Sequence, residues 1–70
     1  HPDAAAGHAA EPIQNQQARQ LYDLAKASLR KMEFSRAVML LEQALGVEPR
    51  SRKLSEALGE ARRLKKMYEG

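Results

Sequence analysis

The sequence predicts an all-α fold, made of a helical hairpin followed by a third helix. Apolar and small residues recur every three or four positions in three separate stretches, which is the period of an amphipathic helix. A short polar break at residues 31–33 separates the first stretch from the second. Gly46 near the end of the second stretch and Pro49 after it are expected stop signals before the third stretch.

Residues 1–11 are rich in alanine and contain no large apolar side chain. A segment of this kind cannot bury enough surface to offset the entropy that it loses on ordering, so we predict a disordered lead-in. Its two histidines, His1 and His8, have no further ligands beside them, and we expect no metal site there. The folded part is predicted over residues 12–68.

The first helix is expected over about residues 13–31. Pro12 suits the first position of a helix, where its missing N–H is not needed, and this favours a start between Pro12 and Asn15. A start near Ala18, the boundary of the repeat described below, stays open. The apolar stripe of this helix consists of Leu21, Leu24, Ala25 and Ser28.

The second helix is expected over about residues 34–46. Leu40 and Val47 widen its apolar sector beyond what one partner helix covers, whereas Met39 points the opposite way and is expected to be exposed. The sector itself consists of Phe34, Ala37, Val38, Leu41, Ala44 and Leu45.

The third helix is expected over about residues 52–68, with Ser51 as its N-cap. Lys65 interrupts its apolar stripe and is expected to extend its amine to water. Arg62, Arg63 and Lys66 occupy the other faces, which is typical of a closing helix with one wet side. The stripe consists of Leu54, Ala57, Leu58, Ala61, Leu64 and Tyr68.

Small and large residues alternate in a fixed order along the first two helices. Ala25, Ala37 and Ala44 would let two helix backbones approach closely, while larger neighbours fill the ridges beside them. Residues 18–51 thereby resemble one unit of the tetratricopeptide repeat (TPR) family, which is built as helix, turn, helix and proline. The matching residues are Leu21, Leu24, Ala25, Phe34, Ala37, Leu41, Ala44 and Pro49.

The resemblance implies one full repeat plus a closing helix, a three-helix fragment of a right-handed solenoid. Two residues depart from the family pattern. Ser28 stands where the family often has Tyr, and Met32 stands where it often has Gly, so the turn between the helices lacks its usual permissive residue.

Catalytic chemistry is not expected. The chain has no cysteine, and its folded part has serines but no histidine to activate them. It also has no glycine-rich phosphate loop and no metal-ligand spacing. We therefore expect a protein that is not an enzyme and that uses no cofactor or metal. No apolar run reaches the roughly 18 residues of a membrane span.

Binding to another protein is the function that the sequence favours. The resemblance implies a ligand surface on the first helix at Arg19, Tyr22, Lys26, Leu29 and Arg30. Four of these residues form a ribbon of three cations and one aromatic ring, which suits an acidic or extended peptide. Some family members clamp a terminal carboxylate with Lys and Asn at the places of Tyr22 and Lys26, and that pair does not match here.

Two alternatives stay open beside this interaction module. The core of so short a chain is thin, and a second copy packing on Leu40 and Val47 would enlarge it. Residues 50–70 carry seven cations against three acids, which makes nucleic-acid contact a third candidate. For residues 50–70 an ordinary solvated helix face is the preferred interpretation, and for the ribbon on the first helix it stays an open alternative.

Overall fold

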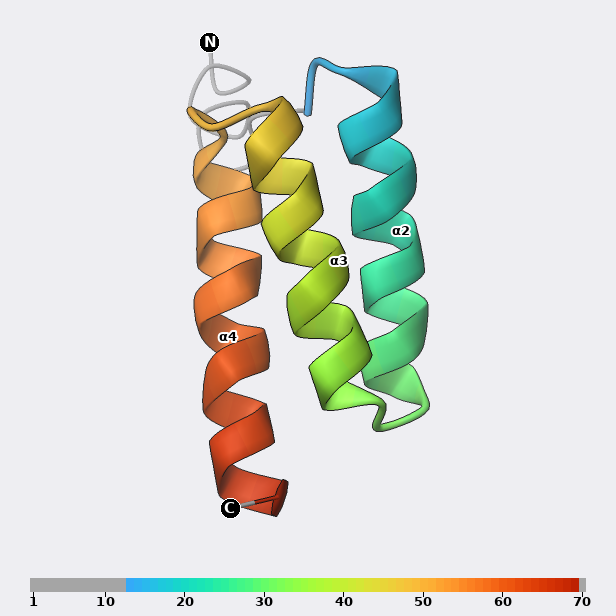
Figure 1. Ribbon diagram of the computed structural model, residues 1–70, viewed down its shortest axis with the longest axis vertical. Helices are drawn as coiled ribbons and strands as arrows, with labels where there is room; N and C mark the ends of the chain where they lie inside the picture. Colours follow the sequence, from blue (N-terminus) through green and yellow to red (C-terminus); the bar gives the residue numbers. More distant parts are fainter. Residues whose placement is uncertain (1–12, 70) are drawn as a thin grey trace, which may run out of the picture.

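The computed structural model describes residues 13–69, and in this part of the chain all regular structure is helical (Figure 1). The three helices are α2 (Gln16–Arg30), α3 (Phe34–Val47) and α4 (Arg52–Glu69). Helix α3 lies between the other two and packs against both. The predicted all-α fold of three helices is confirmed. The predicted disordered lead-in, with Pro12 and both histidines, lies outside the described residues.

Helix α2 begins at Gln16, later than the expected start at residue 13. Asn15 is its N-cap, and the Asn15 side-chain oxygen accepts hydrogen bonds from the backbone N–H groups of residues 17 and 18. The residues before it are held in an extended form by Glu48, whose carboxylate accepts from the N–H groups of Gln14 (3.1 Å) and Asn15 (2.6 Å). Ile13 is buried in the core. These contacts fix the chain before the helix, so the helix cannot extend back to residue 13.

The turn between α2 and α3 is closed by two backbone hydrogen bonds. The N–H of Glu33 donates to the carbonyl of Ser28 (2.8 Å), and the N–H of Met32 donates to the carbonyl of Leu29 (3.0 Å). This is the Schellman pattern, which needs a left-handed residue after the helix cap. Met32 is that residue, with φ of 63°. A side chain in this conformation costs roughly 1–2 kcal/mol relative to glycine.

The core is built around small residues. Ala25 of α2 and Ala37 and Ala44 of α3 are fully buried, as the sequence predicts. Leu41 and Leu54 are the largest side chains that are completely buried. Because the alanines occupy so little space, the backbones of α2 and α3 can lie close together along their length. The buried residues of the hairpin are therefore small ones with leucines beside them, a composition that allows the two backbones to pack closely.

The predicted apolar stripe of α2 is wrong at Leu24. This side chain is 53% exposed, whereas Tyr22 and Leu29 are half-buried against the core. The fully buried residues of α2 are instead Ala18 and Ala25. A residue directly before Ala25 on a helix is turned by about 100°, so Leu24 falls outside the contact.

Helix α4 closes the other side of α3. Ser51 caps it as predicted, since its hydroxyl oxygen accepts from the N–H of Leu54 (3.2 Å). Leu54, Leu58 and Ala61 are buried against α3, and Lys65 is exposed. Arg62 forms an ion pair of 2.9 Å with Glu42 of α3.

An aromatic pair joins α3 and α4 near the end of α4. The Tyr68 ring stacks on Phe34, with 5.4 Å between ring centroids and 11° between ring planes. Tyr68 is nevertheless 58% exposed, so only one of its faces lies against the core. None of the helices in the described part is long and apolar enough to span a membrane.

Candidate functional site

The predicted ligand surface lies on one side of α2. Arg19, Lys26 and Arg30 are exposed, and Tyr22 and Leu29 are half-buried with one side against the core. We call these five residues the α2 face. Exposed charged side chains therefore flank Tyr22 and Leu29, which are held in place by packing against the core. Fixed apolar groups ringed by mobile charges are typical of a surface that binds a partner.

Two ammonium groups lie over the Tyr22 ring. The Nζ atom of Lys26 is 5.4 Å from the ring centroid, and the Nζ atom of Lys53 is at the same distance. Both lie within the range of a cation–π interaction, which contributes about 0.5–1 kcal/mol at an exposed site. Neither lysine is paired with an acid among residues 13–69. The ring thus has two positive charges within 5.4 Å of its centroid.

Lys53 belongs to α4, so the structure extends the α2 face onto a second helix. Sequence analysis missed this residue. A signal existed, because Lys53 follows Arg19 by 34 residues, the length of one tetratricopeptide unit. A residue one repeat after a ligand-facing position is expected to face the same side.

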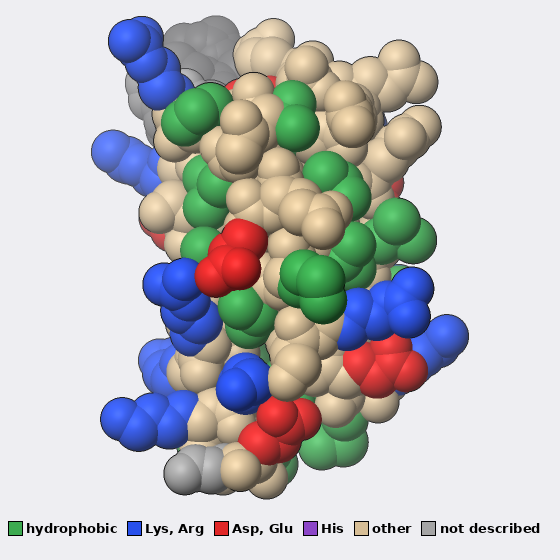
Figure 2. Space-filling model, in the orientation of Figure 1, with side chains coloured by type: hydrophobic (Ala, Val, Ile, Leu, Met, Phe, Trp, Pro, Cys, Tyr) green, Lys and Arg blue, Asp and Glu red, His purple; other side chains and the backbone are tan. Residues whose placement is uncertain are grey.

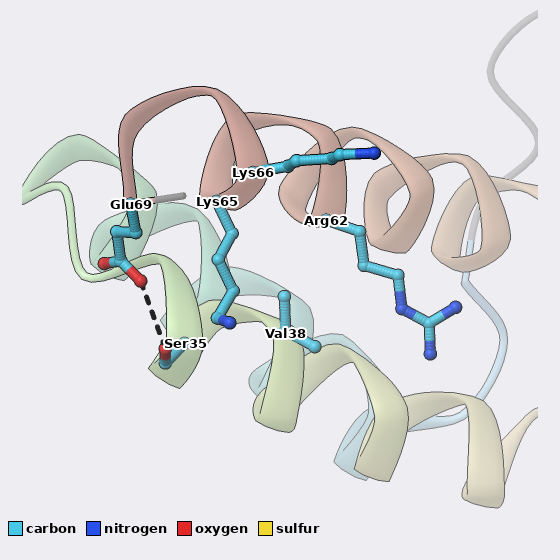
Figure 3. A pocket seen from close by; sticks show the side chains of 6 residues that line it. All are labelled: Ser35, Val38, Arg62, Lys65, Lys66 and Glu69. Atoms are coloured by element: carbon cyan, nitrogen blue, oxygen red, sulfur yellow. Dashed lines mark hydrogen bonds between the residues drawn. The ribbon is translucent and has the colours of Figure 1, made fainter.

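A second surface is a groove between α3 and α4 (Figure 3). Its volume is about 470 Å³, and the side chains that line it come from the first half of α3 and the last turns of α4. The Ser35 hydroxyl donates to the Glu69 carboxylate at 3.5 Å. We call this the α3–α4 groove; it is lined by Ser35, Val38, Arg62, Lys65, Lys66 and Glu69.

The charged and apolar side chains are unevenly distributed. Figure 2 shows Lys and Arg side chains along the edge formed by α4 and again at the lower end of the opposite edge, with hydrophobic side chains spread over the face between them. Of the residues predicted for contact between copies, Leu40 is half-buried and Val47 is 37% exposed. Exposed Leu24 adds to the apolar surface.

Comparison with family models, curated proteins and solved structures finds no match. What the chain does is therefore inferred from its own side chains and their geometry. Among residues 13–69, no three His, Cys, Asp or Glu side chains lie close enough together to hold a metal ion.

Proposed function

We propose that this chain is a non-catalytic protein–protein interaction module that binds an acidic, extended peptide segment of a partner protein. The observation that carries the proposal is the presence of two ammonium groups at the Tyr22 ring, those of Lys26 and Lys53, each 5.4 Å from its centroid. A carboxylate that approaches this ring meets two cations at once. Tyrosine also offers a large contact area with little side-chain entropy to lose, which is why it is common at binding surfaces.

The charge extends along the helix on both sides of Tyr22. From Arg19 to Arg30 the axis of α2 covers about 16 Å, the length of about five residues of an extended peptide. Arg19, Lys26 and Arg30 are exposed along this length. A peptide with several acids would therefore find a cation near each of them, and it could use the half-buried Leu29 for an apolar contact.

The proposed architecture is one tetratricopeptide-like repeat with a closing helix. Leu24 and Leu58 are 34 residues apart, as are Ala25 and Gly59, so α4 repeats part of the pattern of α2. Helices α2 and α4 both pack against α3, as the first helices of successive repeats would pack against the helix between them. The outer side of α4 carries exposed charges, which suits a closing helix; they include Arg52, Glu56, Glu60 and Arg63.

Peptide binding can be tested with a fluorescently labelled peptide of alternating Glu and Ala residues. Its affinity is measured by fluorescence anisotropy, and the same peptide with Gln in place of Glu serves as the uncharged control. Lys26→Glu and Lys53→Glu are each expected to lower the affinity by about tenfold or more, the effect of losing about 1.4 kcal/mol.

Arg36→Glu is the matched protein control, because Arg36 is an exposed cation on α3 outside the α2 face. It changes the net charge by the same amount and should weaken binding much less. Equal weakening by Arg36→Glu and Lys26→Glu would mean that only the net charge attracts the peptide. An unchanged affinity in Lys26→Glu would remove the α2 face from the proposal.

Self-association is a second candidate, favoured by the exposure of Leu24 and of the predicted contact residue Val47. It predicts a molar mass that rises with concentration in light scattering, and a return to the monomer mass in Leu24→Glu. A monomer mass for the unchanged chain up to about millimolar concentration, the range of a weak association of about 4 kcal/mol, would exclude it.

A further inference from the structure

The α3–α4 groove collects positive charge that the proposed peptide site does not use. Three of its six lining residues are cations, Arg62, Lys65 and Lys66, and one is an acid, Glu69, which gives a net charge of +2. Figure 3 shows the Lys65 amine directed into the groove beside Ser35 and Val38, with the Arg62 guanidinium further along it. The cations come from α4, and α3 supplies a hydroxyl and an apolar wall. The groove thus combines several hydrogen-bond donors with an excess of positive charge.

The groove already holds one anionic group of the chain itself. Glu69 accepts a hydrogen bond of 3.5 Å from the Ser35 hydroxyl, at the upper limit of such a bond. Arg62 already forms an ion pair with Glu42, at 2.9 Å. Lys65 and Lys66 have no acidic partner among residues 13–69. Figure 3 shows the Lys66 side chain running along α4 away from Ser35 and Val38, whereas the Lys65 amine points towards them. One ammonium group and a loosely held hydroxyl are therefore available to an anion inside the groove.

We propose that the α3–α4 groove binds a single phosphomonoester group. A phosphomonoester carries nearly two negative charges at neutral pH and three acceptor oxygens. It can therefore accept from Lys65 and Ser35 with two of its oxygens, and its second charge is attracted by Arg62 further along the groove, whereas a carboxylate carries only one charge. Val38 offers an apolar contact to the carbon that carries the phosphate.

A nucleic-acid backbone fits this surface less well. Such a backbone presents a row of phosphates, and its affinity comes from many cations that follow the row. Here acids interrupt the cations, since Arg62 is paired with Glu42 and Arg63 lies 3.8 Å from Glu60. Inside the groove one ammonium group, that of Lys65, lies beside the Ser35 hydroxyl, and this arrangement suits one phosphate.

The experiment is a titration of the ¹⁵N-labelled chain, followed by backbone amide chemical shifts. The probes are inorganic phosphate, free phosphoserine, a short Gly- and Ala-flanked phosphoserine peptide, acetate and a single-stranded oligonucleotide. The proposal expects saturable shifts at Ser35, Val38 and Lys65 with the phosphate-bearing probes, and much weaker shifts with acetate. Tightest binding of inorganic phosphate would indicate a free metabolite as the source, and tightest binding of the peptide would indicate a phosphorylated protein side chain.

Three variants sharpen the result. Lys65→Gln should lower the affinity for phosphoserine by about tenfold, as expected for a lost charge-assisted hydrogen bond. Arg63→Gln removes the same charge from the same helix outside the groove and should lower it much less. Glu69→Gln should raise it by about twofold, because a competing carboxylate is removed. Thermal melting of each variant checks that the fold is unchanged.

Several outcomes would overturn the proposal. These are the absence of groove shifts at tens of millimolar phosphate, equal binding of acetate and phosphate, and equal losses in Lys65→Gln and Arg63→Gln. Tight oligonucleotide binding with shifts spread over all cations of α4 would assign the surface to nucleic acid instead. None of these results depends on the α2 face, whose peptide binding is measured separately.

Discussion

Replacing Met32 by glycine is expected to stabilise the chain. Met32 has φ of 63°, a conformation that costs a side-chain-bearing residue about 1–2 kcal/mol and costs glycine almost nothing. Glycine also increases the entropy of the unfolded chain, and this lowers the gain from relieving the strain by about 0.5–1 kcal/mol. The Met32 side chain is 55% exposed, so little burial is lost. The net gain in the free energy of unfolding is about 0.5–1 kcal/mol.

The assay is thermal or urea unfolding followed by circular dichroism. For a chain of this size, a gain of 1 kcal/mol raises Tm by about 4–8 °C. Met39→Gly is the matched control, since Met39 is 54% exposed but lies inside α3. There glycine should lower the free energy of unfolding by about 1 kcal/mol.

Met32→Gly should therefore raise the free energy of unfolding, whereas Met39→Gly should lower it. Met32→Ala separates strain from side-chain loss, because alanine keeps the strain and should not stabilise. A loss of stability in Met32→Gly equal to that in Met39→Gly would show that residue 32 is not left-handed. The helical hairpin would then need a different turn.

Three further predictions concern the contacts that hold the helices together. Glu48→Ala removes the acceptor of two backbone N–H groups before α2 and should lower the free energy of unfolding by about 1 kcal/mol. Amide hydrogen exchange at residues 14 and 15 should become faster, and unchanged exchange there would contradict the prediction. Ala44→Leu forces extra volume between α2 and α3 and should cost about 1–3 kcal/mol in urea unfolding, whereas a neutral result would mean that the backbones are not in close contact. Tyr68→Ala should lower the free energy of unfolding by about 0.5–1.5 kcal/mol, because the stack on Phe34 is lost, whereas Tyr68→Phe keeps the stack and should leave the stability unchanged. Equal stability of the unchanged chain and both variants would show that the stack contributes nothing.

The helices and the small-residue core could be predicted from the sequence because both depend on local spacing. The burial of Ala25, Ala37 and Ala44 follows from their offsets. The rotation of α2 about its axis could not be predicted with equal success. Size favours Leu24 as a core residue, but close packing at Ala25 turns Leu24 outwards. Where small residues set the contact, the largest side chain is a poor guide to the buried face.

The missing parts of both surfaces come from contacts between distant residues. Lys53 reaches Tyr22 only because α4 packs beside α3, and the 34-residue spacing from Arg19 was the one signal in the sequence. The α3–α4 groove joins Ser35 to Glu69, which are also 34 residues apart. A single serine or a single glutamate in the sequence does not indicate a binding site. A basic stretch at residues 50–70 was visible, but the groove that concentrates its charge depends on how α4 packs on α3.

The most direct test of the proposed function is to map where an acidic peptide contacts the chain. The peptide of alternating Glu and Ala residues is titrated into the ¹⁵N-labelled chain, and the amide shifts are followed residue by residue. We expect the largest saturable shifts at Tyr22, Lys26 and Lys53, with smaller ones at Arg19 and Arg30. No saturable shift, or shifts confined to the surface around Leu24 and Val47, would contradict a peptide site on the α2 face.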